Sequence, residues 1–187
     1  LSYMVQNADA LMLDMERMII YGESAGGCLA AETTHFCVNK GIAHPKGLML
    51  IYPVTDNSQE YASIDEYPYA PWSRLANLNM WKLYLPEGSP EKAKEAVPMA
   101  HDDLSGFPLT YIEASEIDVL RDQDLAYAEK LRNAGIEVQS DTIRGAYHGF
   151  DGEINSPLVK RVLDSRITVL HRMLERLETA AENKVNH

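Results

Sequence analysis

The sequence predicts an α/β fold in which a mostly parallel sheet of about four strands is flanked by helices. Short apolar segments rich in β-branched or aromatic residues alternate with segments of helical periodicity, which is typical of parallel sheets. The 187 residues are 45% hydrophobic and 24% charged, as expected for one globular domain with a sizeable core. We therefore expect a single domain over residues 1–187.

Four strands and four helices are expected in order along the chain. The strands fall at residues 17–21, 47–52, 109–114 and 137–143, and the helices at 25–40, 73–84, 125–133 and 157–181. The first three strands are nearly continuous apolar runs, so we expect both of their faces to be buried. In the last helix a stripe at spacings of four and three favours packing on the sheet over a coiled-coil seam. That stripe consists of Leu163, Ile167, Leu170, Leu174 and Leu177.

Residues 55–98 interrupt this alternation. The segment is rich in Tyr, Trp and Pro and poor in strand signals, and excursions of that length inside a compact domain are usually functional. Tyr67, Tyr69, Trp72 and Trp81 would form either an apolar cap over a pocket or part of the core. The two interpretations fit the pattern equally well.

Charge and hydropathy exclude several classes of protein. The 17 basic and 28 acidic residues give a net charge of −11, which repels nucleic acid and anionic membrane surfaces. No apolar run is long enough to span a bilayer, and we expect no signal peptide because the first residues lack its basic start and apolar stretch. Cys28 and Cys37 are about 13.5 Å apart along one expected helix, so we expect free thiols and a cytoplasmic protein.

The pentapeptide Gly22-Glu23-Ser24-Ala25-Gly26 is the strongest local motif. It lies between the first expected strand and the next helix, which is the context of a nucleophile elbow. A tight strand-to-helix turn strains the serine backbone and brings chains close together, so we expect glycine to be required at both ends. The helix N-terminus favours a developing oxyanion, and the N–H of Ala25 is the first expected donor. By chance alone, G-x-S-x-G occurs in roughly one chain in twenty of this length.

A serine nucleophile needs a base, and the base needs an acid that orients it. Asp118 follows the third expected strand and His148 follows the fourth, in the order Ser, Asp, His expected for a site of this type. Because the carboxyl ends of parallel strands share one edge of the sheet, we expect Ser24, Asp118 and His148 to meet there. Three other acidic residues compete for the role of the acid: Glu116, Asp122 and Asp124.

His148 is preferred among the histidines because it alone follows a strand and stands beside a glycine. The others fall in helices, connecting loops or the tail: His35, His44, His101, His171 and His187. No His or Cys pair stands at metal-ligand spacing, and neither a G-x-G-x-x-G nor a P-loop motif is present. We therefore expect no metal and no cofactor.

These motifs resemble those of the hormone-sensitive-lipase-like branch of the α/β-hydrolases, and the resemblance covers nearly the whole chain. GESAGGCLAAE is similar to the branch's G-[DE]-S-A-G-G motif, IDVLRDQ to its D-P-L-R-D acid motif, and YHGF to its histidine motif. The resemblance implies Ser24 as nucleophile, Asp118 as acid, His148 as base and short acyl esters as substrates. Val119 departs from the proline that is common at that position in the family.

The family's H-G-G-G segment, which supplies further oxyanion-hole N–H groups, has no counterpart in this chain, and neither do the family's first strands. The resemblance therefore implies an N-terminally truncated α/β-hydrolase domain. The nucleophile strand would form a bare apolar edge, and such edges are normally paired or covered. We expect residues absent from this chain, or a second copy of it, to lie against residues 17–21.

The sequence thus favours a carboxylic ester hydrolase, of the esterase or lipase type, that acts on a small-molecule ester through an acyl-enzyme intermediate. Two alternatives stay open. One is a serine peptidase of related fold, and the other is a non-catalytic ligand-binding or assembly module that kept the fold. The absent H-G-G-G segment favours the module, whereas the intact set of Ser, Asp and His opposes it.

Overall fold

The computed structural model describes residues 1–85 and 94–185, with side chains up to residue 177. At its centre lies one sheet of four parallel strands in the order β1-β2-β3-β4. The strands are β1 (Ile19–Glu23), β2 (Gly47–Ile51), β3 (Leu109–Ile117) and β4 (Val138–Tyr147). The predicted α/β class with a four-stranded parallel sheet is confirmed.

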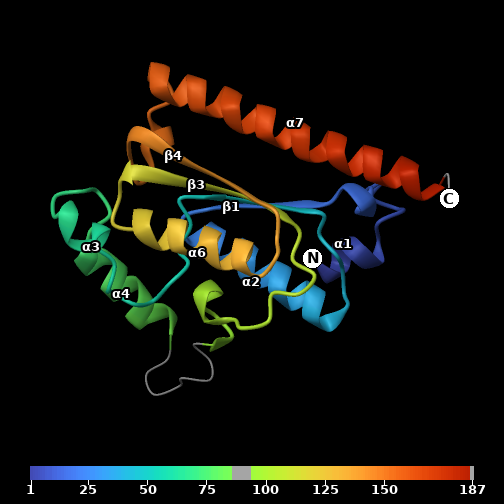
Figure 1. Cartoon of the computed structure of the whole chain (residues 1–187), viewed down its shortest axis with the longest axis horizontal. Coiled ribbons are helices and arrows are strands. Elements are labelled where there is room, and N and C mark those ends of the chain that lie inside the picture. Colours follow the sequence, from blue (N-terminus) through green and yellow to red (C-terminus); the bar gives the residue numbers. More distant parts are fainter. Residues whose placement is uncertain (86–93, 186–187) are drawn as a thin grey trace.

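Helices cover both faces of this sheet (Figure 1). α2 (Ala25–Lys40) and α6 (Arg121–Asn133) lie on one face, and α7 (Pro157–Val185) crosses the other. The shorter elements are α1 (Ser2–Gln6), α3 (Ser63–Glu66), α4 (Arg74–Tyr84) and the 3₁₀ helices η1 (Met15–Arg17), η2 (Pro98–Ala100) and η3 (Phe150–Gly152). The carboxyl ends of the strands therefore meet at one edge, between the helical layers.

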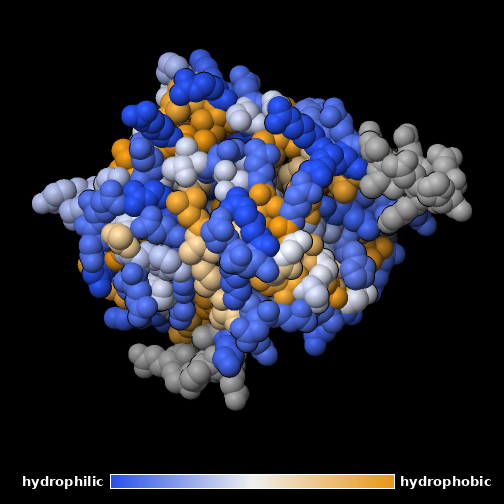
Figure 2. Space-filling model, viewed as in Figure 1, coloured by the Kyte–Doolittle hydropathy of each residue, from blue (hydrophilic) through white to orange (hydrophobic). Residues whose placement is uncertain are grey.

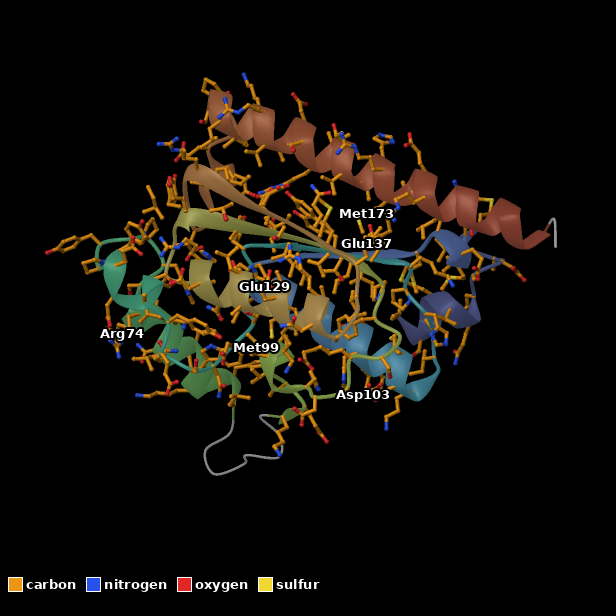
Figure 3. All side chains as sticks on the ribbon, viewed as in Figure 1. Arg74, Met99, Asp103, Glu129, Glu137 and Met173 are labelled. Atoms are coloured by element: carbon orange, nitrogen blue, oxygen red, sulfur yellow. The ribbon has the colours of Figure 1, made fainter. Side chains whose placement is uncertain are left out.

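β2 is buried on both faces, and its alternate residues enter two different cores. Leu48 and Leu50 pack with residues of α2 and α6, whereas Met49 and Ile51 pack with residues of α7. Met173, labelled in Figure 3, lies between α7 and the sheet, where its methyl carbon would be 2.7 Å from a Cβ on Gly47. α7 thus packs on the sheet at the start of β2 through the flexible side chain of Met173.

α7 packs on the sheet as predicted, but through a different stripe of side chains from the predicted one. Within residues 157–177 of α7, the buried residues are Val159, Val162, Arg166, Val169 and Met173. Leu163, Ile167 and Leu170 of the predicted stripe are 41%, 53% and 37% exposed. Both stripes recur every three or four residues, so helical periodicity alone could not choose between them. The exposed stripe lines an apolar groove of about 360 Å³ together with Ile19, Tyr21 and Met49.

β1 differs from its predicted burial and from its predicted bounds. It is an edge strand that pairs only with β2 among the described residues, and its Tyr21 is exposed. It starts at Ile19 because Asp14 accepts hydrogen bonds from Glu16 and Arg17 and holds residues 15–17 in η1. The expectation that further residues or a second copy cover this edge stays a prediction.

The described part of residues 55–98 packs over a third core cluster at the carboxyl edge of the sheet. Ile64, Trp81 and Val97 are buried there, and Trp72 packs against them, while Tyr69 is exposed. Residues 86–93 lie outside the described residues. A role for this segment as a cap stays a prediction.

The surface facing the viewer in Figure 2 is mostly hydrophilic, with hydrophobic side chains gathered in patches between the polar ones. In the described ranges, no helix combines the length and the apolar character needed to cross a bilayer. Cys28 and Cys37 are both buried and both free, as expected from their spacing on α2.

Candidate active site

Ser24 lies in the turn between β1 and α2, and its backbone is strained. Its φ is 53° and its ψ is −123°, and a positive φ is uncommon for any residue other than glycine. The Ser24 N–H donates to the Ile51 carbonyl, and the Ser24 carbonyl accepts from the Val54 N–H. The strain that was predicted for the elbow serine is therefore present, and hydrogen bonds to the end of β2 maintain it.

Two glycines beside Ser24 are required by close packing. A Cβ on Gly22 would lie 2.1 Å from the Gly26 carbonyl oxygen, and a Cβ on Gly27 would lie 2.6 Å from Cβ of Pro53. The expectation that glycine is required at Gly26 is wrong, because a Cβ there would meet nothing within 4 Å. The close approach falls one residue further along, where α2 passes the chain that leaves β2.

The N-terminus of α2 follows Ser24 directly. Ala25 is the first helical residue, so its backbone N–H has no acceptor within the helix. The Ser24 side chain makes no capping hydrogen bond to α2. A helix N-terminus carries partial positive charge, and an anion that forms beside Ser24 is stabilised by that charge.

Three side chains that are far apart in the sequence meet at the carboxyl edge of the sheet. Ser24 Oγ is 2.7 Å from His148 Nε2, and His148 Nδ1 is 2.7 Å from Asp118 Oδ2. The Asp118 side chain is fully buried and that of His148 is 10% exposed. The structure thus brings together the three residues that the sequence selected.

The turn at the start of α6 orients Asp118. Asp118 Oδ1 accepts the Leu120 N–H at 3.0 Å, so the other carboxylate oxygen is the one that faces His148. The Asp118 carbonyl accepts the Arg121 N–H. With this turn in place α6 begins at Arg121, four residues before the start that the sequence predicted.

The three competing acids make other contacts. Glu116 accepts the Gly145 N–H at 2.7 Å, and Asp122 accepts the Ser63 N–H at 2.9 Å. Asp124 is fully buried, and neither of its carboxyl oxygens has a hydrogen-bond partner. Among the described residues, the carboxylate that accepts a hydrogen bond from His148 is that of Asp118.

Asp124 should make the stability of the protein depend on pH. Burial, and next the charge of Asp118, raise the pKa of Asp124 well above its usual value. The stability that a raised carboxyl pKa contributes is fully present below the unfolded-state pKa of about 3.9. It is lost as the pH rises from there to the pKa of the folded state, because over that range the unfolded chain ionises this group while the folded chain keeps it protonated.

We therefore expect the free energy of unfolding of Asp124→Asn, relative to that of the wild type, to be larger at pH 8 than at pH 5. Urea unfolding at the two pH values measures the change, and exposed Asp102→Asn is the control. A difference between Asp124→Asn and the wild type that is the same at both pH values would show that Asp124 is ionised in the folded protein.

Two aromatic rings contact the His148 imidazole. The Trp72 ring stacks on it with centroids 5.5 Å apart and planes at 27°, and the Tyr52 ring meets it edge-on at 5.0 Å and 62°. Trp72 was predicted to lie in a cap or in the core, and Tyr52 was not predicted to be part of the site. No local signal marks Tyr52, which stands at the end of an apolar strand like an ordinary core residue.

A pocket of about 570 Å³ opens beside Ser24 and His148. Its lining also includes Glu23, Tyr52 and Arg166. The volume is in the range that is typical of small-molecule sites. A larger pocket of about 770 Å³ lies against α2 and contains none of the three hydrogen-bonded residues, so size alone does not locate the chemistry.

A second group of titratable side chains lies beside that larger pocket. His35 and His101 stack with ring centroids 3.6 Å apart, and His101 Nε2 is 2.9 Å from a Glu32 carboxylate oxygen. Within the part of the chain that the structure describes, no three His, Cys, Asp or Glu side chains are arranged to hold a metal ion.

Comparison with known proteins places the chain beside esterases and lipases. A family model described as the alpha/beta hydrolase fold matches residues 1–152. Lipase 2 from Moraxella sp. is 26% identical over 90% of this chain and 45% of its own length. Ethyl acetate hydrolase from Pseudomonas putida is 29% identical over 79% of this chain and 47% of its own length.

Solved structures give the same grouping. The structure of a bacterial heroin esterase matches with a TM-score of 0.88 at 31% identity, over 93% of this chain and 57% of that chain. The chain spans about half the length of the curated relatives it matches. The activity and substrates of the whole relatives are therefore a matter of proposal for this chain.

Proposed function

Because the chain belongs to the α/β-hydrolase fold family, in its hormone-sensitive-lipase-like branch, we propose that it hydrolyses small-molecule carboxylic esters with Ser24 as nucleophile. The observation that carries the proposal is the continuous hydrogen-bonded path from Asp118 through His148 to Ser24. Esterase and lipase relatives favour an ester over a peptide as the substrate.

The first half of the reaction forms an acyl-enzyme. Nε2 of His148 accepts the proton of the Ser24 hydroxyl while Oγ attacks the carbonyl carbon of the ester. The negative charge that develops on the carbonyl oxygen is stabilised by the Ala25 N–H and the N-terminus of α2. His148 then donates its proton to the departing alcohol, and the acyl group stays on Ser24.

The second half repeats these steps with water. His148 removes a proton from the water molecule that attacks the acyl carbon. It returns that proton to Oγ as the bond between Ser24 and the acyl group breaks, which releases the carboxylic acid and restores the Ser24 hydroxyl. Asp118 accepts the Nδ1–H of His148, which keeps Nε2 free to act as the base and stabilises the imidazolium that forms. Because Leu120 occupies the other oxygen of Asp118, this orientation is held throughout.

Labelling with a fluorophosphonate probe tests the proposal. The probe reacts with an activated serine, so we expect Ser24 to be modified in the folded chain and the modified peptide to contain residue 24. Labelling should disappear in Ser24→Ala and persist in Ser105→Ala, which changes an exposed serine. A folded wild type that resists labelling would instead favour the non-catalytic module.

A further inference from the structure

We propose that Tyr52 and Asp151 are positioning residues that fix the orientation of the His148 imidazole, with Arg166 as their buried anchor. The inference rests on the proposed function, in which His148 is the catalytic base. Among the described contacts, Tyr52, Asp151 and Arg166 form no hydrogen bond to Ser24, His148 or Asp118. They act on His148 through the loop that follows β4.

Tyr52 is held in an unfavourable backbone conformation at the end of β2. Its φ is 33°, a value that is costly for a residue with a large side chain. Its N–H donates to the Glu113 carbonyl, and its ring is almost fully buried. This conformation presents the ring edge-on to His148, and the phenol O–H donates to Asp151 Oδ1 at 2.6 Å.

Asp151 fastens the loop that carries His148. It stands three residues after His148 in η3, beyond the left-handed turn at Gly149, whose φ is 74°. While Oδ1 accepts from Tyr52, Oδ2 accepts from Arg166 Nη1 at 2.7 Å. Both carboxylate oxygens are therefore used, one toward β2 and one toward α7.

Arg166 joins this loop to the strand that leads to Asp118. It is 5% exposed, and its Nη2 donates to Glu113 Oε1 at 2.6 Å. Glu113 lies on β3, five residues before Asp118. The same guanidinium also lies over the ring of Phe150, 5.7 Å from its centroid. The buried Arg166 thus links the strand that leads to Asp118 with the loop that follows His148.

The hydrogen-bond network of Tyr52, Asp151, Arg166 and Glu113 has protonation states that fit the positioning role. Burial alone would raise the pKa of Asp151, but the hydrogen bonds from Tyr52 and Arg166 outweigh burial and the pKa lies below its usual value. Burial, and then the hydrogen bond to Asp151, raise the pKa of Tyr52. Tyr52 is therefore a neutral phenol that donates to an anionic carboxylate, which is the stronger kind of hydrogen bond.

Removing Arg166 would be a poor test, because the buried Glu113 and the half-buried Asp151 would each lose an ion pair and the fold would suffer. Tyr52→Phe is sharper, since it deletes one oxygen and keeps the ring against His148. Tyr61→Phe is a matched control: its phenol O–H donates to Asp56 Oδ2 at 2.7 Å, outside this network, and its ring has no contact with His148 among the described contacts.

The experiment measures kcat and KM for p-nitrophenyl acetate, and the low-field proton NMR resonance of the His148 Nδ1–H bonded to Asp118. For Tyr52→Phe we expect kcat to fall about tenfold with KM within about twofold, because a small misplacement of the base slows the chemical step. The resonance should broaden or disappear. For Tyr61→Phe we expect both quantities to match the wild type.

Asp151→Asn gives a second route to the same answer. Combined with Tyr52→Phe it should lower kcat little more than Asp151→Asn alone, because both changes remove the hydrogen bond between Tyr52 and Asp151. Equal kcat and an unchanged resonance in Tyr52→Phe would overturn the inference. A wild type without turnover would contradict the proposed function. The Nδ1–H resonance of His148 would then test the inference by itself. Loss of the resonance in Tyr52→Phe would support the positioning role of Tyr52, and an unchanged resonance would refute it.

Discussion

Replacing Ser24 with Ala is expected to abolish ester hydrolysis, with kcat falling by about 10⁶-fold as in serine hydrolases that lose their nucleophile. The reason is local: Ala at position 24 leaves His148 correctly bonded to Asp118 but with no alcohol to deprotonate. Release of p-nitrophenol from acetyl and butyryl esters measures the effect over several orders of magnitude.

The stability of Ser24→Ala should match that of the wild type, because the Ser24 side chain gives α2 no capping hydrogen bond. Ser115→Ala is the matched control, since Ser115 is buried in β3 and its hydroxyl has no hydrogen-bond partner. If Ser24→Ala kept its turnover while Ser115→Ala lost it, the assignment of the nucleophile would be wrong.

Asp118→Asn is expected to lower kcat by about 10⁴-fold while the protein stays folded. The amide oxygen of Asn can still accept the Leu120 N–H, which leaves the amide NH₂ facing Nδ1 of His148. His148 must then accept at Nδ1 and carry its proton on Nε2. In that tautomer it cannot remove the Ser24 proton. Steady-state kinetics, with thermal unfolding as a check on folding, measures the loss.

The competing acids supply the controls for this prediction. In Glu116→Gln and Asp122→Asn the remaining amide oxygen can still accept the Gly145 N–H and the Ser63 N–H, so both proteins should keep their fold. We expect kcat in both to stay within a few-fold of the wild type. A loss in either of them as large as that expected for Asp118→Asn would point to a different orienting acid.

Much of the site could be read from the sequence because its signals are local. The elbow is a contiguous pentapeptide, and α2 follows it with the predicted bounds. Asp118 and His148 could be selected because each follows an apolar strand, and the parallel order of the strands brings their ends together. The mutual distances of 2.7 Å then depend on turns, such as the one at Leu120, that sequence patterns do not specify.

Other features depend on contacts between segments that are far apart in the sequence. The requirement for glycine falls at Gly27 and not at Gly26 because Pro53 lies against α2 at that point. Tyr52 and Asp151 are 99 residues apart, and Glu113 and Arg166 are 53 apart, so no local pattern links them. Arg166 even occupies a buried position on α7 that a hydrophobic-stripe argument assigns to an apolar residue.

By itself, then, the sequence determined what short-range forces specify: alternating strands and helices, the strained turn at Ser24, and the strand-following positions of Asp118 and His148. Backbone hydrogen bonding and hydrophobic periodicity depend on residues a few positions apart, so the sequence pattern predicts these features. Only the tertiary structure decided which stripe of α7 is buried, that Tyr21 on β1 is exposed, and which side chains contact His148. Those outcomes follow from packing between distant segments, where several equally periodic faces compete and the space left by neighbouring elements selects one.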